Sequence, residues 1–341
     1  MCHGDAVEIV QGSVHKAFPL DDPSRVGEVR RHVAALCVEL GFDEVLSAQA
    51  AIVVNELGTN LVKHAKGGRL LVATRSGAVP ELEILSIDQG PGIGDLAMAM
   101  RDGFSTAGSP GTGLGAVKRL AADFGIHSDL AKGTVAVARL RRGAGPRSQF
   151  RCGVVALPAP GEVVCGDGWA LAFEDAQAAV LLADGLGHGE HAAEASQAAV
   201  SLFVQQAFAP LKEALESAHA SLRMTRGAAV TRAVLDAEAN TVRMVGAGNV
   251  LMRLVSGTSN RSVLPQNGTV GVQIRRVEEI RQEWPPHAMA VVHSDGLQSR
   301  WPPEAITPLL GADPSLAAAV LLRDYGRGPD DVTIVALRRD D

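Results

Sequence analysis

The feature that most constrains this chain is a repeated sequence pattern. In this pattern an apolar run ends in an aspartate, and a glycine follows closely after it. Asp88, Asp184 and Asp295 each end such a run, with a glycine one or two positions later. The first lies in the N-terminal third of the chain, and the other two lie in the C-terminal half. A strand that ends in a carboxylate and a turn presents that carboxylate at the end of a sheet, where glycine lets other groups approach the backbone. The sequence therefore predicts two separate sets of strands with acidic ends.

Length and composition allow two domains. The chain has 341 residues, 46% of them hydrophobic, which is enough for two cores of ordinary size. Residues 139–151 read RLRRGAGPRSQFR, a basic segment rich in glycine and proline between two apolar runs. Such a segment is typical of a solvated linker, although a patch that binds polyanions would have the same composition. We expect residues 1–145 to form one domain and residues 146–341 the other.

Charge and cysteine usage limit the class of protein. The formal net charge is −6, whereas a protein that binds nucleic acid would usually carry a basic face. The four cysteines show neither C-x-x-C pairs nor regular spacing, which favours a reduced chain over a disulfide or zinc scaffold. The first eleven residues lack the pattern of a signal peptide, and no apolar run approaches about 18 residues. We expect a cytoplasmic protein that binds neither nucleic acid nor membranes.

The N-terminal part begins with two expected strands and continues with long helices. Residues 6–10 and 13–18 read as strands that pair with each other, and residues 43–66 read as a helix with one apolar face. Glu56 and Asn60 are four positions apart, so they share a face of that helix. There a carboxylate can orient a hydroxyl group while an amide oxygen binds a divalent ion, although such a pair is also common by chance.

Two glycine-rich segments follow this helix. Asp88 can accept a hydrogen bond from an exocyclic amine while the glycines after it let the backbone approach a flat ring; a tight turn after an edge strand is the alternative. The glycine run 111–115 opens an amphipathic helix, whose free N–H groups can bind phosphate. Three such pieces in this order predict a nucleotide site. Its candidate residues are Asn60, Asp88, Gly90, Gly92, Gly94, Gly111, Thr112, Gly113, Leu114 and Gly115.

Residues 20–140 resemble the GHKL (Bergerat) ATPase fold in its branch of anti-sigma-factor serine kinases, the RsbT- and RsbW-like proteins. The residues that carry this resemblance are the helix with Glu56 and Asn60, Asp88 with its glycines, and the segments 102–108 and 113–120. The resemblance implies an α/β sandwich that binds ATP and Mg²⁺. In that fold Glu56 would be the general base, Asn60 would hold the ion, Asp88 would contact adenine, and residues 111–115 would close over the phosphates.

The C-terminal part places further aspartates at the ends of expected strands. Asp184 and Asp295 each precede a glycine, and Asp330 with Asp331 precedes the last apolar run. Carboxylates that converge at strand ends repel one another, and an oxygen-preferring cation such as Mg²⁺ or Mn²⁺ removes that repulsion. The alternative for each aspartate is the cap of a turn or helix. Many strands with a few long helices predict the α+β class, with two sheets faced by helices.

Residues 150–340 resemble the metal-dependent type 2C protein phosphatases of the bacterial SpoIIE and RsbX branch. The motifs that carry this resemblance are Pro160-Gly161-Glu162, Cys165-Gly166-Asp167, the segment 184–189, Ser294-Asp295-Gly296 and the segment 330–333. It implies an α-β-β-α sandwich, two ions of Mn²⁺ or Mg²⁺, and direct attack of water on phosphorus without a phosphoenzyme. The metal ligands that it implies are Asp184, the carbonyl of Gly185, Asp295, Asp330 and, more weakly, Asp167.

Three further residues near these motifs have open roles. Asp331 stands where the resembling family often has asparagine. His188 could protonate the leaving serine oxygen, or it could contact the start of the helix that follows. Cys165 is followed five positions later by leucine, not by the arginine that a cysteine phosphatase needs, so we expect it to be a small buried apolar residue.

The two resemblances imply opposed activities in one polypeptide. We expect a kinase that phosphorylates serine or threonine on a STAS-domain anti-anti-sigma or stressosome-type protein, and a phosphatase that removes this phosphate. A sigma factor, a downstream phosphatase or a second copy of the chain are further candidate partners. His15 lies in a strand-like segment, which disfavours a histidine kinase. The alternative is an ATP-binding module that senses nucleotide or binds a partner, which would leave the phosphatase as the only catalytic activity.

Overall fold

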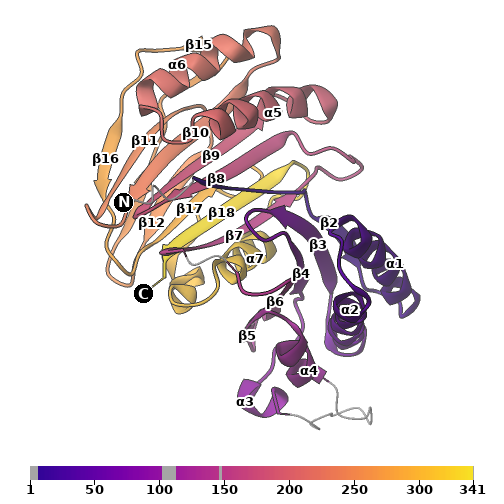
Figure 1. The fold of residues 1–341 in the computed structure, drawn as a ribbon. Helices are drawn as coiled ribbons and strands as arrows, with labels where there is room; N and C mark the ends of the chain where they lie inside the picture. The colour runs from indigo at the N-terminus through magenta and orange to yellow at the C-terminus, as the bar shows by residue number, and fades with distance from the viewer. Residues whose placement is uncertain (1–6, 102–112, 146–147, 341) are drawn as a thin grey trace, which may run out of the picture. The chain divides into compact units, whose positions relative to one another are not determined.

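The computed structural model describes residues 7–101, 113–145 and 148–340. The chain divides into two compact units. One unit is formed by residues 15–146, and the other combines residues 1–14 with residues 147–341. Figure 1 shows both units, with labels on most of their helices and strands.

The first unit is a five-stranded antiparallel sheet with helices on one face. The strand order is β2-β3-β4-β6-β5. Helices α1, α2 and α4 pack against this sheet around one apolar core. The elements are β2 (Lys16–Pro19), α1 (Ser24–Glu39), α2 (Glu44–His64), β3 (Arg69–Ser76), β4 (Glu81–Ile87), α3 (Leu96–Ala99), α4 (Gly113–Leu120), β5 (Asp123–Asp129) and β6 (Gly133–Arg141).

Helix α2 supplies one wall of the site described below. It begins after Asp43, whose side chain accepts a hydrogen bond from the Leu46 N–H at 2.8 Å, and this N-cap satisfies a donor that the first helical turn leaves free. Its buried residues recur every three or four positions and face the core. By length and mean hydropathy, α2 is the one helix in the described residues that could cross a membrane. The apolar face of α2 packs against the sheet, and the apolar composition of this helix is therefore that of a helix in a protein core.

The second unit contains two antiparallel sheets and a short hairpin. The first sheet has the order β16-β11-β10-β9-β8-β1, and the second has the order β13-β12-β17-β18-β7. The strands are β1 (Glu8–Gly12), β7 (Phe150–Leu157), β8 (Asp167–Glu174), β9 (Gln177–Gly185), β10 (Ala228–Asp236), β11 (Thr241–Ala247), β12 (Leu251–Val255), β13 (Asn260–Val263), β14 (Gly268–Thr269), β15 (Gln273–Ile274), β16 (Ile280–Glu283), β17 (Met289–His293) and β18 (Val332–Arg339).

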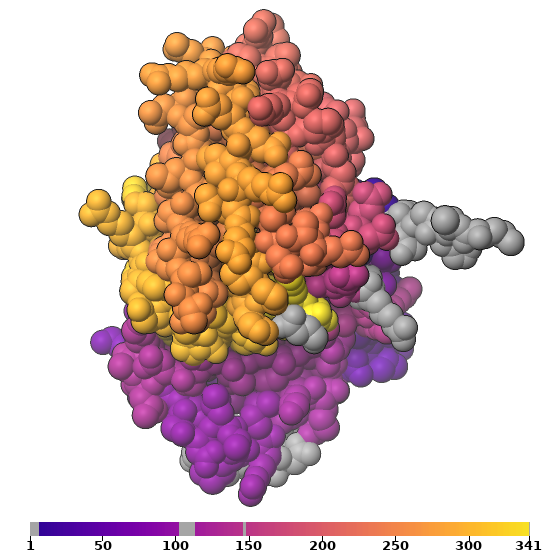
Figure 2. Space-filling view, turned by 90° about the vertical axis from the view of Figure 1, so that its left-hand side faces the viewer, coloured from indigo at the N-terminus to yellow at the C-terminus, as the bar shows by residue number. Residues whose placement is uncertain are grey.

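The two sheets of this unit pack face to face, with helices on their outer sides. Residues of both sheets share one buried core, in which Trp169 and Leu182 of the first sheet join Met252 and Val292 of the second. Helices α5 (Glu190–Gln205) and α6 (Leu211–Ser221) cover the first sheet, and α7 (Pro314–Tyr325) covers the second. In Figure 2, the segment from β12 to β16, drawn in orange, forms much of the visible surface of this unit. The predicted α-β-β-α sandwich and the α+β class are thus confirmed.

Strand β1 differs from the expectation. We predicted that the first two strands pair with each other, but β1 pairs antiparallel with β8, with Ile9 opposite Ala172, while β2 pairs with β3. The physical reason is that β1 has an apolar residue for each face of the β8 edge. Ile9 packs on the core under α5, and Val10 packs on the core between the sheets. Strand β1 therefore belongs to the second unit.

Candidate active sites

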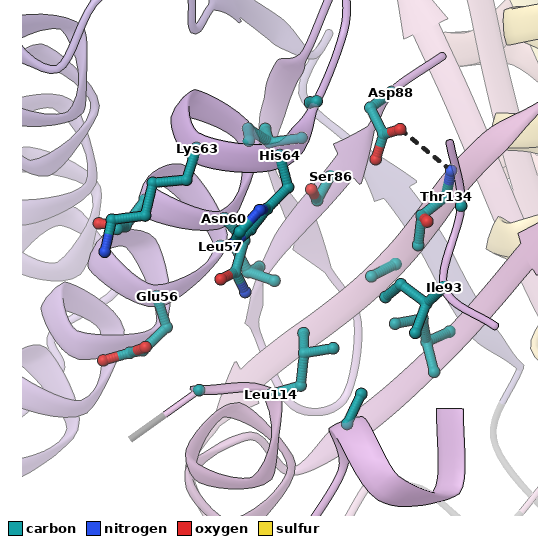
Figure 3. A pocket seen from close by; sticks show the side chains of 18 of the residues that line it. Glu56, Leu57, Asn60, Lys63, His64, Ser86, Asp88, Ile93, Leu114 and Thr134 are labelled. Atoms are coloured by element: carbon teal, nitrogen blue, oxygen red, sulfur yellow. Dashed lines mark hydrogen bonds between the residues drawn. The ribbon is translucent and has the colours of Figure 1, made fainter. Parts of the chain in front are cut away.

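The first unit contains a cavity of about 540 Å³ between α2, the turn that follows β4 and the N-terminus of α4. Figure 3 shows that α2 forms one wall and that Asp88 and Thr134 lie opposite. The cavity is large enough for a nucleotide-sized ligand. Its lining residues are Glu56, Leu57, Thr59, Asn60, Leu61, Lys63, His64, Ala65, Ser86, Asp88, Pro91, Gly92, Ile93, Ala99, Gly113, Leu114, Ile126, Thr134 and Ala136.

Helix α2 brings two of the predicted residues to this cavity. Glu56 and Asn60 are half-buried and line it one helical turn apart. Lys63 and His64 line it as well, and the sequence analysis missed them. They follow Asn60 by three and four positions, so the helical period that joined Glu56 to Asn60 would also have found them. This face of α2 thus combines a carboxylate, an amide and a basic side chain.

Asp88 is held in place by the backbone around it. Its Oδ1 accepts hydrogen bonds from the N–H groups of Gly90, at 2.7 Å, and Thr134, at 3.2 Å. Gly133 has φ +95°, and a Cβ there would lie 2.4 Å from the Asp88 carbonyl oxygen, so only glycine permits this approach. The other carboxylate oxygen of Asp88 points into the cavity, where it can accept a hydrogen bond from an exocyclic amine (Figure 3).

The predicted glycines that the structure describes divide into three groups. Gly92 and Gly113 line the cavity together with Leu114, and α4 begins at Gly113 beside it. Gly90 does not line the cavity but donates to Asp88, so it acts through the carboxylate. Gly94 and Gly115 lie outside the lining. The predicted residues Gly111 and Thr112, and the segment 102–108, lie outside the described residues.

In the second unit, the predicted aspartates lie at neighbouring strand ends. Asp184 and Gly185 end β9, and Asp167, the first residue of β8, lies directly opposite Asp184. Asp295 follows β17, and Asp330 precedes β18, the strand paired with β17. Antiparallel pairing brings Asp167 opposite Asp184 in the first sheet and Asp295 and Asp330 to neighbouring strand ends in the second. Packing of the two sheets then brings these pairs to one edge.

Hydrogen bonds fix two of these carboxylates. The Ser294 hydroxyl donates to Asp167 Oδ2 at 2.7 Å and accepts from the Thr333 N–H at 2.9 Å. Asp167 Oδ1 is buried and has no hydrogen-bond partner within the described ranges. Asn249 donates from Nδ2 to Asp295 Oδ2 at 2.7 Å, a contact that no sequence motif indicated.

The carboxylates act on one another electrostatically. Burial, with the charges of Asp167, Asp295 and Asp330, raises the pKa of Asp184 to about 9. Burial also raises the pKa of Asp167 to about 7, against the opposing effect of its hydrogen bond from Ser294. A cluster of acidic groups with this mutual repulsion is stabilised by a cation that prefers oxygen ligands.

The donor set fits a divalent ion, although the side chains do not form a finished cage. In the part of the chain that the structure describes, no three His, Cys, Asp or Glu side chains are gathered in a metal-binding arrangement. The fit rests on the oxygen-only ligands, on their uncompensated charge and on the unpartnered Oδ1 of Asp167. Mg²⁺ and Mn²⁺ both prefer such ligands.

Asp331 has a structural position. It is buried, its Oδ1 accepts from the Ala159 N–H at 2.8 Å, and its Oδ2 accepts from the Gly166 N–H at 2.9 Å. Both oxygens therefore tie the segment between β7 and β8 to the start of β18. Asp331 thereby positions the loop that leads into Asp167.

Two other residues flank this edge. His188 lies in the turn between β9 and α5, and its Nδ1 is 2.8 Å from Glu162 Oε1. Cys165 is buried, and burial, followed by the charges of Asp167 and Asp331, raises the pKa of its thiol far above the usual range. Since a thiol of this kind stays protonated, Cys165 is no nucleophile.

Comparison with known proteins finds a family for each half of the chain. A model of the histidine kinase-like ATPase domain matches residues 20–140, and a model of stage II sporulation protein E (SpoIIE) matches residues 174–340. The serine/threonine-protein kinase RsbT of Bacillus subtilis (strain 168) is 41% identical over 99 residues, which are 28% of this chain and 73% of RsbT.

Two solved structures share the fold of the second unit. One comes from the bacterial stressosome, a modular system adapted to control secondary messenger signalling; its TM-score is 0.53 at 23% identity, covering 56% of this chain and all of that one. The other is RsbX in complex with magnesium, with a TM-score of 0.52 at 21% identity, covering 57% of this chain and 98% of that one. The chain belongs to the family of the serine/threonine-protein kinase RsbT and joins this kinase domain of the GHKL type to a SpoIIE-type protein phosphatase domain of the 2C class.

Proposed function

We propose that this chain both phosphorylates and dephosphorylates serine or threonine on a STAS-domain partner, in a cytoplasmic partner-switching pathway. The observation that carries the proposal is the presence, in one polypeptide, of a nucleotide-sized cavity with Glu56 and Asn60 and of a carboxylate cluster around Asp184. The family relationship to RsbT supports the kinase, and the match to SpoIIE supports the phosphatase.

In the kinase half, each wall of the cavity has a role. Glu56 takes the proton from the partner's serine or threonine hydroxyl group. The oxygen of that hydroxyl group attacks the γ-phosphorus of ATP, and ADP departs. Asp88 accepts a hydrogen bond from the adenine amine, and the N-terminus of α4 at Gly113 faces the phosphates. Asn60 would hold a Mg²⁺ ion, which neutralises phosphate charge when bound.

In the phosphatase half, Asp184, the Gly185 carbonyl, Asp295 and Asp330 would hold two ions of Mn²⁺ or Mg²⁺. When bound, such ions activate water and neutralise charge on the phosphoryl group. Asn249 orients Asp295 through its hydrogen bond at 2.7 Å, and we assign Asp167 a weaker share in the site. His188, whose Nδ1 is 2.8 Å from Glu162, can hold a proton at Nε2 for the leaving oxygen.

The partner is inferred from the relatives. RsbT is a serine/threonine-protein kinase, and one structure similar to the second unit comes from the stressosome. We infer a STAS-domain anti-anti-sigma or stressosome-type protein as the substrate, with a sigma factor, a downstream phosphatase or a second copy of the chain as further partners. Simultaneous activity of both sites would only hydrolyse ATP, so we expect binding of nucleotide or partner to favour one activity over the other.

A two-stage labelling experiment tests the proposal. The full chain and a STAS protein that co-purifies with it are incubated with γ-labelled ATP and Mg²⁺, and ATP is then depleted in the presence of Mn²⁺. We expect labelling that Glu56→Gln abolishes and loss of label that Asp184→Asn abolishes. Glu44→Gln, at the exposed start of the same helix, and Asp175→Asn, at the opposite turn of the β8–β9 hairpin, are the matched controls.

The same experiment separates the second candidate function. A first unit that only senses nucleotide predicts loss of pre-formed label but no labelling, with a rate of loss that ATP changes. Labelling that is unchanged in Glu56→Gln would remove Glu56 as the base. Loss of label that is unchanged in Asp184→Asn would remove the carboxylate cluster as the phosphatase site.

A further inference from the structure

Arg226 lies in the turn that precedes β10, directly beside the carboxylate cluster. The first residue of β10, Ala228, is opposite Gly185, and the next residue is opposite Asp184. The Leu186 N–H donates to the Gly227 carbonyl at 3.0 Å, which fastens this turn to the loop that follows Asp184. The backbone of Arg226 is therefore fixed within a few residues of the expected metal ligands.

The side chain of Arg226 extends over that loop. A Cβ on Gly187 would lie 3.2 Å from Arg226 Nη1, and Gly187 has φ +90°. Glycine at this position both allows the turn and leaves room for the guanidinium group. Arg226 is exposed and makes no ion pair or hydrogen bond with any residue in the described ranges. Its five N–H donors thus remain available to a ligand.

A second arginine at this edge is engaged differently. The charge of Arg327 lowers the pKa of Asp295, against the raising effects of burial and Asp330. Its backbone N–H donates to the Gly296 carbonyl at 2.8 Å. Arg327 therefore stabilises a carboxylate of the cluster, whereas the guanidinium group of Arg226 lies beside Gly187.

The charge balance of the site gives Arg226 a role. Two divalent ions would only neutralise the four carboxylates Asp167, Asp184, Asp295 and Asp330. A phosphomonoester approaches with nearly two negative charges, so binding it in place needs a further fixed positive group. A guanidinium can donate two parallel hydrogen bonds to phosphoryl oxygens, which fixes their orientation as well as their charge.

We propose that Arg226 is a substrate-binding residue that holds the phosphoryl group of the phosphoprotein at the edge of the second unit. This inference rests on the proposed phosphatase activity. It adds a contact to the phosphoryl group that the acidic strand-end motifs of the second unit do not contain. It assigns Arg226 to the phosphate and not to the metal ions.

The test compares the full chain with Arg226→Ala, Arg226→Lys and the control Arg223→Ala, an exposed arginine in the short helical turn Leu222–Met224. The substrates are p-nitrophenyl phosphate and a phosphoserine peptide in Mn²⁺, and inorganic phosphate is the competitive inhibitor. Loss of one charge-assisted contact predicts a decrease in kcat/KM and an increase in the inhibition constant of phosphate of about 10- to 100-fold for Arg226→Ala. Arg226→Lys should show a smaller change in kcat/KM and in the inhibition constant of phosphate than Arg226→Ala does. Arg223→Ala should change neither quantity.

Metal dependence distinguishes this role from a structural one. The Mn²⁺ concentration for half-maximal activity should be the same in Arg226→Ala and in the unmodified chain. An unchanged inhibition constant for phosphate, or a change confined to Mn²⁺ dependence, would overturn the proposal. If the unmodified chain hydrolyses neither substrate, the phosphatase assignment fails, and calorimetric binding of phosphate in Mn²⁺ to the same variants still decides the role of Arg226.

Discussion

Removal of the Asp331 side chain tests the structural role that its hydrogen bonds assign to it. The carboxylate is buried and accepts from two backbone N–H groups, those of Ala159 and Gly166, at 2.8 and 2.9 Å. Both donors lie in buried residues. In Asp331→Ala they lose their acceptor without gaining another, because β18 and the segment after β7 remain in place.

The magnitude follows from the cost of unsatisfied donors. Each buried N–H group without an acceptor costs about 1–3 kcal/mol, so the pair costs about 2–6 kcal/mol. Removing a negative charge near Asp167 offsets a part of this loss, since Asp331 raises the pKa of Asp167 by repulsion. We expect the free energy of unfolding of the second unit to fall by about 2–5 kcal/mol. Asp331→Asn keeps one acceptor oxygen and should lose about 1–2 kcal/mol.

Tryptophan fluorescence during urea unfolding measures this change in the second unit alone, because Trp169, Trp284 and Trp301 are the three tryptophans of the chain and all lie there. With EDTA present, metal binding does not contribute. A slope of about 2 kcal/mol per molar urea converts the expected loss into a midpoint shift of about 1–2.5 M. Glu216→Ala, at an exposed position of α6 in the same unit, is the control. A shift in Asp331→Ala no larger than that of the control would refute the assignment.

Three other predictions follow from the same structure. Burial acts to raise the pKa of Glu83, but two neighbouring arginines hold it well below the usual range; its stabilising effect is therefore complete above about pH 4.5 and lost in acid. Glu83→Gln should cost about 3–5 kcal/mol at neutral pH and progressively less as the pH falls from about 4.5 to 2, as measured by circular dichroism. Gly133→Ala should displace Asp88 and weaken ATP binding about tenfold or more, whereas Gly143→Ala, which also has positive φ but open space, should not. The pKa of Asp184, raised by burial to about 9, means that the folded state binds more protons than the unfolded state between about pH 4 and 9. In EDTA the Tm of the second unit should thus fall as pH rises across this range, and Mn²⁺ should restore most stability at the upper end.

The parts of the fold that local signals determine could be predicted. Residues 43–66 were expected as a helix, and α2 spans Glu44–His64, because Asp43 supplies an N-cap and the apolar period fixes the buried face. The same period placed Glu56 and Asn60 on one wall of the cavity. Lys63 and His64 also line the cavity, and the same helical spacing, three and four positions after Asn60, predicts their place on that face.

Strand β1 shows what local signals omit. Its pairing with β8 joins Ile9 to Ala172, residues separated by the whole kinase unit, and nothing in residues 8–12 specifies a partner so distant. An edge strand pairs wherever both of its faces can be covered. Here the two faces of β8 supply two different cores, so the choice of partner is a property of the assembled sandwich.

The Asp330-Asp331 pair marks the limit of reading a site from sequence. Two adjacent residues that enter a strand point to opposite sides, so one can face the open edge while the other is buried. Asp330 is exposed and Asp331 is buried, which makes the first a ligand candidate and the second an acceptor for backbone N–H groups. An alternation of polar and apolar residues along β18 would have indicated the phase, but nearly every residue from Val332 to Arg339 is buried. Since the strand is covered on both faces, its sequence does not show which residues point to which side. Only the packed structure shows which of the two carboxylates is buried and which is exposed.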